Sequence, residues 1–340
     1  MDQNKPKLTP AGEAATPPVI HIKNLHKTYV VSQQEAGAKA ALQSLVHRHK
    51  LEIPAVDGIS FDMSPGEIVG FLGPNGAGKT TTLKMLSGLL HPTSGDITVL
   101  GYVPWKREKA FLRQITLVMG QRNQLIWDIP AISSFELNRA IYRLPPDDFR
   151  RTLKELTELL ELGPLLNKPV RNLSLGERMK CEIAAALLHR PTVVFLDEPT
   201  IGLDIMMQRR IRTFIAEYNR HFGATVLLTS HYMADVEALC KRVVIIHHGR
   251  LLFDGDLSLL VQKFTEHKTI ILQIGDCQAD LSSYGRVESC EDGRFTLRVP
   301  RAETARVTER LLAELPVIDL LVEDPPIEEV IERVFAQENP

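Results

Sequence analysis

Short apolar runs separated by longer mixed segments fill the first 260 residues. After an opening strand over residues 20–30, the runs occupy residues 58–63, 68–72, 96–100, 115–119, 193–197, 225–229 and 243–247. Several are apolar at consecutive positions, as strands are when a parallel sheet buries both of their faces. Segments with helical spacing of apolar residues lie between them. This alternation predicts an α/β domain.

A mostly helical stretch from residue 133 to residue 173 interrupts the alternation. Ser133 and Glu136 have the spacing of a capping box and predict a helix start. Phe149, Leu156 and Leu160 then mark one face of a second helix. We therefore expect a helical subdomain, over residues 121–190, inserted into the α/β core.

Three further segments define the domain boundaries. Residues 1–18 are polar and rich in Pro and Ala, which predicts a disordered tail before the α/β domain, which we place over residues 19–262. An insertion over residues 31–54 contains apolar residues at helical spacing beside basic ones, which predicts either a plain surface helix or a partner-binding segment. Beyond residue 262, expected strands at 269–274 and 295–299 and helices at 302–312 and 327–335 predict a small α+β accessory domain over 268–340.

Composition narrows the class of protein. The chain has 340 residues, 44% of them hydrophobic and 24% charged, with a formal net charge of -2. The near-neutral charge argues against nucleic acid as a partner. No run approaches the roughly 18 apolar residues of a membrane-spanning helix, so we expect a cytoplasmic protein or one attached to a membrane through a partner. The four cysteines lack metal-type spacing and predict reduced structural thiols.

A glycine-rich loop follows the run at 68–72 and precedes a helix-compatible segment. It fits the G-x-x-x-x-G-K-[ST] phosphate-loop motif with the residues Gly73, Pro74, Asn75, Gly76, Ala77, Gly78, Lys79 and Thr80. Glycines let backbone N–H groups surround phosphate, and the helix that follows, with Thr81, adds its positive end. Lys79 can reach phosphate oxygens and the Thr80 hydroxyl can ligate Mg²⁺. The alternative is an ordinary turn with a solvated lysine.

Two acids end the apolar run at 193–197. Asp197 would hold Mg²⁺ near the phosphate loop, through water or through Thr80, and Glu198 would polarise a water toward the γ-phosphate. Without the phosphate loop, both would be ordinary solvated acids at a strand end.

A second helix start suits phosphate. Ser174 and Glu177 have capping-box spacing, and Gly176 bares backbone N–H groups at the positive end of a long helix. Although such a cap occurs in many proteins, two phosphate-binding helix starts in one chain suggest a dimer in which each subunit completes the other's site.

These motifs together resemble the ATP-binding subunit of an ABC transporter. The resemblance covers residues 20–255 and includes the segments at 173–177, 197–200, 202–204 and 230–231. It is strongest to the ABC-2 branch of drug and polysaccharide exporters, whose permeases are separate chains. It implies a P-loop NTPase core with a helical subdomain, ATP and Mg²⁺ as ligands, and ATP hydrolysis coupled to transport.

The resemblance also implies roles for single residues. Tyr29 would stack on adenine, although the insertion after it departs from the common pattern. Gln121 would touch Mg²⁺ and the attacking water. Ser174, Gly176 and Glu177 would face the nucleotide of the partner subunit; Leu175 and Glu177 stand where the family's commonest signature has Gly and Gln. Asp204 would join the two sites across the dimer, and His231 would hold the γ-phosphate and the water.

The implied partners are a second ATP-binding subunit and ABC-2-type permease subunits at the cytoplasmic face of the cell membrane. One alternative is a soluble ATPase of the same family that acts on DNA or ribosomes; no long heptads, Cys pairs or second phosphate loop support it. A kinase is a weaker alternative, because it leaves residues 173–177 and His231 unexplained.

Overall fold

The computed structural model describes residues 17–32, 50–120, 124–275 and 280–336. Its centre is a six-stranded sheet in the order β5-β6-β7-β3-β8-β9. The first five strands in that order are parallel, and β9 pairs antiparallel with β8. The strands are β3 (Ile68–Leu72), β5 (Ile115–Met119), β6 (Val193–Asp197), β7 (Thr225–Thr229), β8 (Arg242–His247) and β9 (Arg250–Asp256). The predicted α/β class is confirmed.

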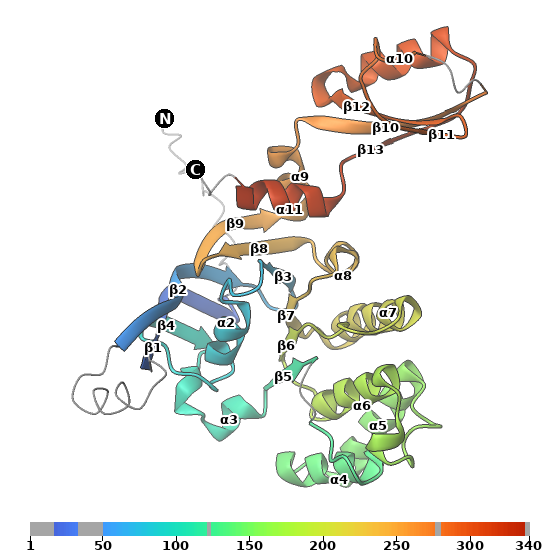
Figure 1. Ribbon diagram of the computed structural model, residues 1–340. Coiled ribbons are helices and arrows are strands. Elements are labelled where there is room, and N and C mark those ends of the chain that lie inside the picture. Colours follow the sequence, from blue (N-terminus) through green and yellow to red (C-terminus); the bar gives the residue numbers. More distant parts are fainter. Residues whose placement is uncertain (1–16, 33–49, 121–123, 276–279, 337–340) are drawn as a thin grey trace, which may run out of the picture.

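An antiparallel three-stranded sheet in the order β2-β1-β4 lies beside the central sheet (Figure 1). Its strands are β1 (Ile20–Ser32), β2 (Lys50–Met63) and β4 (Ser94–Val99). The pairing of Tyr29 with Ile53 and of Val31 with Leu51 continues the hairpin into the predicted insertion. Strand therefore occupies both ends of the 31–54 segment, and its middle, 33–49, lies outside the described residues.

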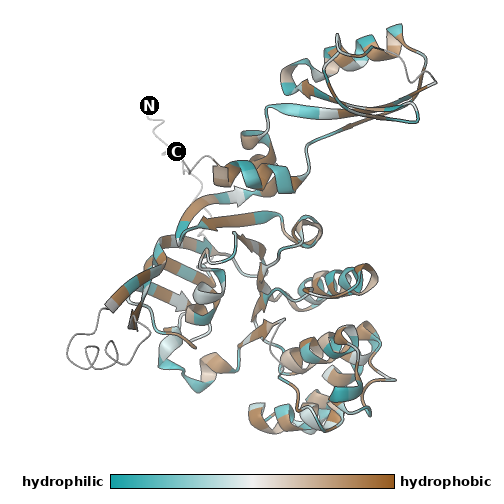
Figure 2. Cartoon of the chain, viewed as in Figure 1, coloured by the Kyte–Doolittle hydropathy of each residue, from teal (hydrophilic) through white to brown (hydrophobic). Residues whose placement is uncertain are grey.

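Helices follow the strands as the alternation predicts. Beside the central sheet lie α2 (Lys79–Leu86), α3 (Lys109–Leu112), α7 (Ile205–Phe222), α8 (Met233–Leu239) and α9 (Leu257–Phe264). The inserted helices are α4 (Ala131–Tyr142), α5 (Pro146–Leu160) and α6 (Leu175–Leu187). Figure 2 shows brown, apolar central strands and mixed helices, because each helix buries only one stripe.

Helix α4 corrects one detail of the sequence analysis. Its N-cap is Pro130 and no side chain caps it, so the predicted capping box at Ser133 and Glu136 does not form. Ser133 lies inside the first turn, and Glu136 pairs instead with Arg139. Proline at the boundary ends the extended segment and needs no N–H partner, so it can start the helix without a polar cap.

The accessory sheet has the order β11-β12-β10-β13. It consists of β10 (His267–Ile274), β11 (Arg286–Glu291), β12 (Arg294–Pro300) and β13 (Val317–Glu323), and it packs on α10 (Thr304–Glu314) around a core of its own.

The last helix, α11 (Ile327–Ala336), differs from the expectation that it belongs to the accessory domain. Its buried residues are Ile327, Val330, Ile331 and Val334. They belong to the core of the α/β domain, and the helix contacts α9. Figure 1 shows α9 and α11 together between β9 and the accessory sheet. The accessory sheet is therefore inserted between two helices of the main domain.

Candidate active site

The glycine-rich loop connects β3 to α2 at the carboxyl end of the central sheet. Gly78 has a left-handed φ of 105°, and a Cβ there would lie 2.4 Å from the Ala55 carbonyl oxygen, so only glycine fits. The Lys79 ammonium donates to the carbonyl oxygens of Gly73 at 2.6 Å and Pro74 at 3.1 Å. Burial lowers the pKa of Lys79, while the Glu198 and Asp197 carboxylates oppose that shift. The loop and its lysine thus form an anion-binding cradle.

Asp197 lies at the end of β6 and joins this cradle. Its Oδ2 accepts a hydrogen bond from the Thr80 hydroxyl at 2.9 Å, and its Oδ1 accepts one from the Thr229 hydroxyl at 2.7 Å. A hydroxyl and a carboxylate side by side are the hard oxygen ligands that Mg²⁺ prefers. Among the described residues no group of three or more His, Cys, Asp or Glu could form a metal cage. The residues fit a Mg²⁺ ion that takes most of its ligands from phosphate and water.

Glu198 follows in a left-handed conformation with a φ of 56°. Its N–H donates to the Thr229 carbonyl and hydroxyl oxygens, both at 3.1 Å. Its Oε1 lies 2.7 Å from Nε2 of His231, which follows β7. Left-handed backbone at a non-glycine residue costs of the order of 1 kcal/mol and concentrates at functional sites. The structure thus brings Lys79, Thr80, Asp197, Glu198 and His231 into one cluster.

A buried carboxylate fastens the loops that carry Glu198 and His231. Asp235 is 1% exposed, and its Oδ2 accepts from the hydroxyls of Thr200 at 2.5 Å and Ser230 at 2.8 Å. Its Oδ1 lies 2.8 Å from Nη1 of Arg212. Because Thr200 and Ser230 sit two residues and one residue from the two functional side chains, Asp235 fixes their separation.

The second helix start for which we predicted phosphate binding is the start of α6. The Ser174 hydroxyl accepts from the Glu177 N–H at 3.2 Å, and the Glu177 carboxylate accepts from the Ser174 N–H at 2.8 Å, so the predicted capping box is confirmed. The Ser174 N–H bond is the main cause that lowers the pKa of Glu177. The Ser174 hydroxyl proton remains available to a ligand. Figure 1 places α6 apart from α2, so one chain does not bring the two phosphate sites together.

The start of α7 packs directly on this second site. Asp204 is the N-cap of α7 and accepts from the Met207 N–H at 2.8 Å. A Cβ at Gly176 would meet Met207 Cγ at 2.9 Å, and a Cβ at Gly202 would meet Leu175 at 3.1 Å. Gly176 therefore lets Met207 lie against the exposed backbone of the helix start.

Two further predicted residues remain, Tyr29 and Gln121. Tyr29 is 37% exposed on β1, with the Lys27 ammonium 5.4 Å from its ring centroid, which leaves ring surface for a flat partner. Gln121 lies outside the described residues. Gly120, just before it, donates its N–H to the Asp197 carbonyl oxygen at 2.9 Å. A Cβ at Gly120 would lie 2.2 Å from the Glu198 carbonyl oxygen, so Gly120 itself packs directly against Glu198.

Sequence reasoning missed another buried acid. Glu182, in α6, is 3% exposed and accepts the Gln124 N–H at 2.8 Å and the Leu125 N–H at 3.3 Å. Burial raises the pKa of Glu182, and these two N–H bonds oppose the shift. The available signal was an acid on the apolar part of α6, between Cys181 and Ile183.

The comparisons with known proteins agree with this geometry. The family model for ABC transporters matches residues 56–201, and the model "EvrA-like ABC transporter, C-terminal domain" matches residues 266–323. The ABC transporter ATP-binding protein NatA of Bacillus subtilis is 35% identical over 213 residues, which span 63% of this chain and 86% of NatA. This chain belongs to the ATP-binding proteins of ABC transporters.

Two further likenesses extend the match. The Nod factor export ATP-binding protein I of Burkholderia pseudomallei is 38% identical over 212 residues, 61% of this chain and 67% of that protein. A solved ATP-binding subunit of an ABC transporter superposes with a TM-score of 0.60 at 26% identity, over 72% of this chain and 93% of that one. This ABC protein thus binds ATP and hydrolyses it, and no helix among its described residues has the length and apolarity to cross a bilayer.

Proposed function

We propose that this protein works as a dimer of ATP-binding subunits at the cytoplasmic face of a membrane, where ATP-driven closure moves a substrate outward through separate ABC-2-type permease subunits. The single observation that carries the proposal is the 2.7 Å contact between Glu198 and His231, beside the phosphate cradle. The word "export" in the name of the Burkholderia relative supports the direction.

Thr80 and Asp197 would hold Mg²⁺, which when bound neutralises charge on the phosphates. Glu198 orients the attacking water and accepts its proton, while His231 and Lys79 donate to the developing charge on the transferred phosphoryl group. The hydrogen bonds of Thr229 and Asp235 offset the conformational strain of the Glu198 backbone. They hold Glu198 and His231 at the edge of the sheet.

The Ser174 helix start supplies the other half of each site from the partner subunit. Its hydroxyl proton and the N–H groups near Gly176 suit the γ-phosphate. Glu177 keeps Ser174 in place through the capping box, so we assign it a positioning role. Because ATP has the bridging γ-phosphate and ADP lacks it, ATP favours the closed dimer and hydrolysis releases it.

The test compares wild-type protein with Glu198→Gln and, as a matched control, Glu309→Gln on the exposed side of α10. We expect Glu198→Gln to lose ATP hydrolysis by about 10²–10⁴-fold, to retain ATP binding, and to form an ATP-dependent dimer by size-exclusion chromatography. Glu309→Gln should match wild type. Near-normal turnover in Glu198→Gln would contradict the proposal that Glu198 accepts the proton of the attacking water.

The same Glu198→Gln protein, tagged and loaded with ATP, tests the partner. Isolated from detergent-solubilised membranes of its native cell, it should carry a polytopic membrane protein in stoichiometric amount. Recovery of soluble proteins alone would contradict the transporter proposal and favour an ATPase that acts away from membranes.

A further inference from the structure

A groove lies between α7 and α8, with a volume of about 590 Å³. The two helices pack against each other beside the central sheet (Figure 1). The volume lies within the range of about 300–1,000 Å³ in which proteins bind small molecules. Because α7 follows the strand that ends at Asp197 and α8 follows the strand that leads to His231, a ligand in this groove contacts both helices that follow the catalytic strands.

The α7–α8 groove is basic. Three arginines line it, Arg209, Arg212 and Arg220, against one acid, Glu217. The three arginines share one face of α7, because their spacing follows the turns of the helix. Arg209 and Arg220 are exposed and have no ion-pair partner in the part of the chain that the structure describes. Cations gathered on one face, in a chain of net charge -2, favour an anionic ligand at this place.

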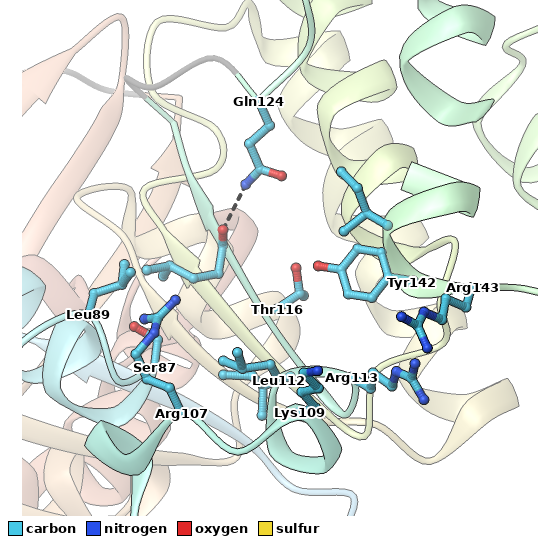
Figure 3. Close-up of a pocket in the computed structure, with 13 residues that line it drawn as sticks. Ser87, Leu89, Arg107, Lys109, Leu112, Arg113, Thr116, Gln124, Tyr142 and Arg143 are labelled. Atoms are coloured by element: carbon cyan, nitrogen blue, oxygen red, sulfur yellow. Dashed lines mark hydrogen bonds between the residues drawn. The ribbon is translucent and has the colours of Figure 1, made fainter. Parts of the chain in front are cut away.

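The lining side chains restrict the kind of anion that fits. Among the described residues, no aromatic side chain and no apolar side chain larger than Ala lines the α7–α8 groove. Figure 3 shows a different groove, beside β5, where Tyr142, Leu89 and Leu112 line the walls together with basic residues. Nucleobases stack on aromatic rings, and protein segments are anchored by large side chains in pockets. The α7–α8 groove offers neither, which favours a small hydrophilic anion.

The spacing of the arginines suits an anion with more than one charged group. Arg209 and Arg220 are eleven residues apart in the sequence. That separation is about 16 Å along the axis of an α-helix. A single phosphate ion is too small to contact both side chains, whereas two phosphoryl groups on one molecule can each meet a guanidinium. Guanidinium groups bind phosphoryl oxygens through paired N–H donors, which makes a phosphorylated molecule the best match.

Arg212 connects the groove to the catalytic loops. Its Nη1 lies 2.8 Å from Oδ1 of Asp235, the buried acid that also accepts from the hydroxyls of Thr200 and Ser230. Its Nε and Nη2 have no hydrogen-bond partner among the described residues, and the side chain is 16% exposed where it lines the groove. These two nitrogens can therefore donate to a ligand. One guanidinium can hold Asp235 on one side and an anion on the other.

We propose that the groove between α7 and α8 binds a small soluble molecule with two or more phosphoryl groups, and that the bound molecule slows ATP hydrolysis. The phosphoryl groups accept hydrogen bonds from the three arginines. Because the ligand and Asp235 then share Arg212, the support that Asp235 gives to the loops of Glu198 and His231 weakens. The effect on hydrolysis rests on the roles proposed above for Glu198 and His231, and the binding site itself does not.

The first experiment measures binding by isothermal titration calorimetry. The full chain is saturated with Mg²⁺ and a non-hydrolysable ATP analogue, so that the phosphate cradle at Lys79 is already filled. The probes are inorganic pyrophosphate, fructose 1,6-bisphosphate and inositol hexakisphosphate, with Mg²⁺ in excess, and inorganic phosphate is the control. We expect one of the probes to bind at one site per subunit, about tenfold or more tighter than phosphate, because it makes further charge-assisted hydrogen bonds. Absence of binding by all three probes would overturn the proposal.

The second experiment locates the bound probe. Arg209→Ala with Arg220→Ala should weaken its binding by about tenfold or more, because two charged donors are lost. The matched control, Arg294→Ala with Arg306→Ala, removes two exposed arginines of the accessory domain and should leave the affinity unchanged. Binding of the ATP analogue reports that the groove variant is folded. An unchanged affinity for the probe in the folded groove variant would overturn the site.

Steady-state kinetics test the effect on hydrolysis. In wild type the probe should lower kcat by about fivefold or more, because small displacements of catalytic groups are costly in rate. The KM for ATP should stay unchanged, whereas a probe that competes at the cradle of Lys79 would raise KM and leave kcat unchanged. The variant Arg209→Ala with Arg220→Ala should lose the inhibition. Binding at the groove with an unchanged kcat would overturn the inhibitory role.

The outcomes separate this inference from the function proposed above. If Glu198→Gln keeps near-normal turnover, the catalytic assignment fails, while probe binding and its loss in the groove variant still support the site. If Glu198→Gln behaves as expected and no probe binds, only the inference fails. If wild-type protein floats with phosphatidylglycerol vesicles, the variant Arg209→Ala with Arg220→Ala does not, and no soluble probe binds, the anion is a lipid headgroup and the inference is wrong.

Discussion

At the scale of single residues, Glu198 and His231 are held in place by hydrogen bonds to the residues around them. Glu198 keeps its left-handed backbone because Thr229 binds its N–H, and His231 is held through Ser230. Asp235 joins both loops with one carboxylate oxygen. The positions of Glu198 and His231 therefore depend on a buried acid, Asp235.

Asp235→Ala should both destabilise the protein and slow hydrolysis. Removing a buried acid leaves Arg212 without its partner and should lower the free energy of unfolding by about 3 kcal/mol. Urea unfolding and the rate at saturating ATP measure the two effects. Asp96→Ala, at an exposed position with no ion pair among the described residues, is the control. A stable Asp235→Ala protein with normal turnover would contradict the positioning role.

His189 should make stability depend on pH. Burial lowers the pKa of His189 to about 4. Its Nε2 lies 3.1 Å from the Ile115 carbonyl oxygen and must donate, while its buried Nδ1 has no hydrogen-bond partner among the described residues. Between about pH 6.5 and pH 4, His189 is protonated in the unfolded chain but remains neutral in the folded chain. Stability should therefore fall with falling pH, by up to about 1.4 kcal/mol per pH unit from this group.

The measurement compares the free energy of unfolding of wild type and His189→Gln at pH 7 and pH 5. Gln can keep the bond to the Ile115 carbonyl but does not titrate. Wild type should lose more stability than the variant over this interval, with Tyr142, the stacked neighbour, uncharged at both pH values because burial raises its pKa. Equal losses would show that His189 is not the group responsible.

At the scale of elements, two helix starts touch each other within one subunit. The backbone at Gly176, where α6 begins, lies against Met207 in the first turn of α7. Asp204, expected at the dimer contact, caps that same turn. A displacement of the first turn of α7 would therefore be passed to the start of α6 by direct packing.

Gly176→Ala should lower ATP hydrolysis by about tenfold or more, because the added methyl group displaces Met207 or the helix start. Gly176→Ala combined with Met207→Ala should recover most of the lost rate, since the second change removes the atoms that the methyl group meets. Met207→Ala alone is the control. Failure of the double variant to recover would place the need for glycine in the ligand contact instead.

The sequence predicted those strands and helices whose apolar residues form a regular pattern within one short segment. The strands before Gly73, before Glu198 and before His231 are continuous apolar runs, so both their existence and their polar ends could be located. β9, β11 and β13 were missed because their exposed faces carry polar residues and break the apolar run. β11 is exposed along its whole length.

The partners of buried polar residues could not be predicted in the same way. The sequence shows Asp235 as one acid on a short helix, and only the folded chain brings Thr200 and Ser230 to it. Likewise, Glu182 meets Gln124 across 58 residues of sequence. The apolar spacing of α11 predicted a helix correctly, but the same spacing fits either core, and its assignment to the accessory domain was wrong.

At the scale of the whole molecule, the accessory sheet has a hydrophobic core separate from the two clusters of the main domain, and the chain passes between the two domains twice. Val330 of α11 lies in the core of the ATPase, although it follows the accessory sheet in sequence. Leu311 of α10 lies in the accessory core. Changes at these two positions should therefore affect different parts of the protein.

Leu311→Ala should lower the unfolding temperature of the accessory sheet and leave ATP hydrolysis intact, at a cost of about 2–5 kcal/mol to that unit. Val330→Ala, later in the chain, should instead lower the transition of the ATPase. Calorimetry resolves the two transitions, and the ATPase assay assigns them. A single transition shifted equally by both changes would show that the two cores unfold as one.

The return of α11 to the main domain has a further consequence. The chain leaves the ATPase domain after α9 and returns to it beside the same helix. The accessory sheet is therefore an inserted domain whose two ends meet the ATPase domain at one site. Evolution could replace this inserted domain by another without changing the fold of the ATPase domain, provided that the two ends of the replacement lie close together. A fluorescent protein inserted at the same site, between α9 and α11, should leave the ATPase domain active.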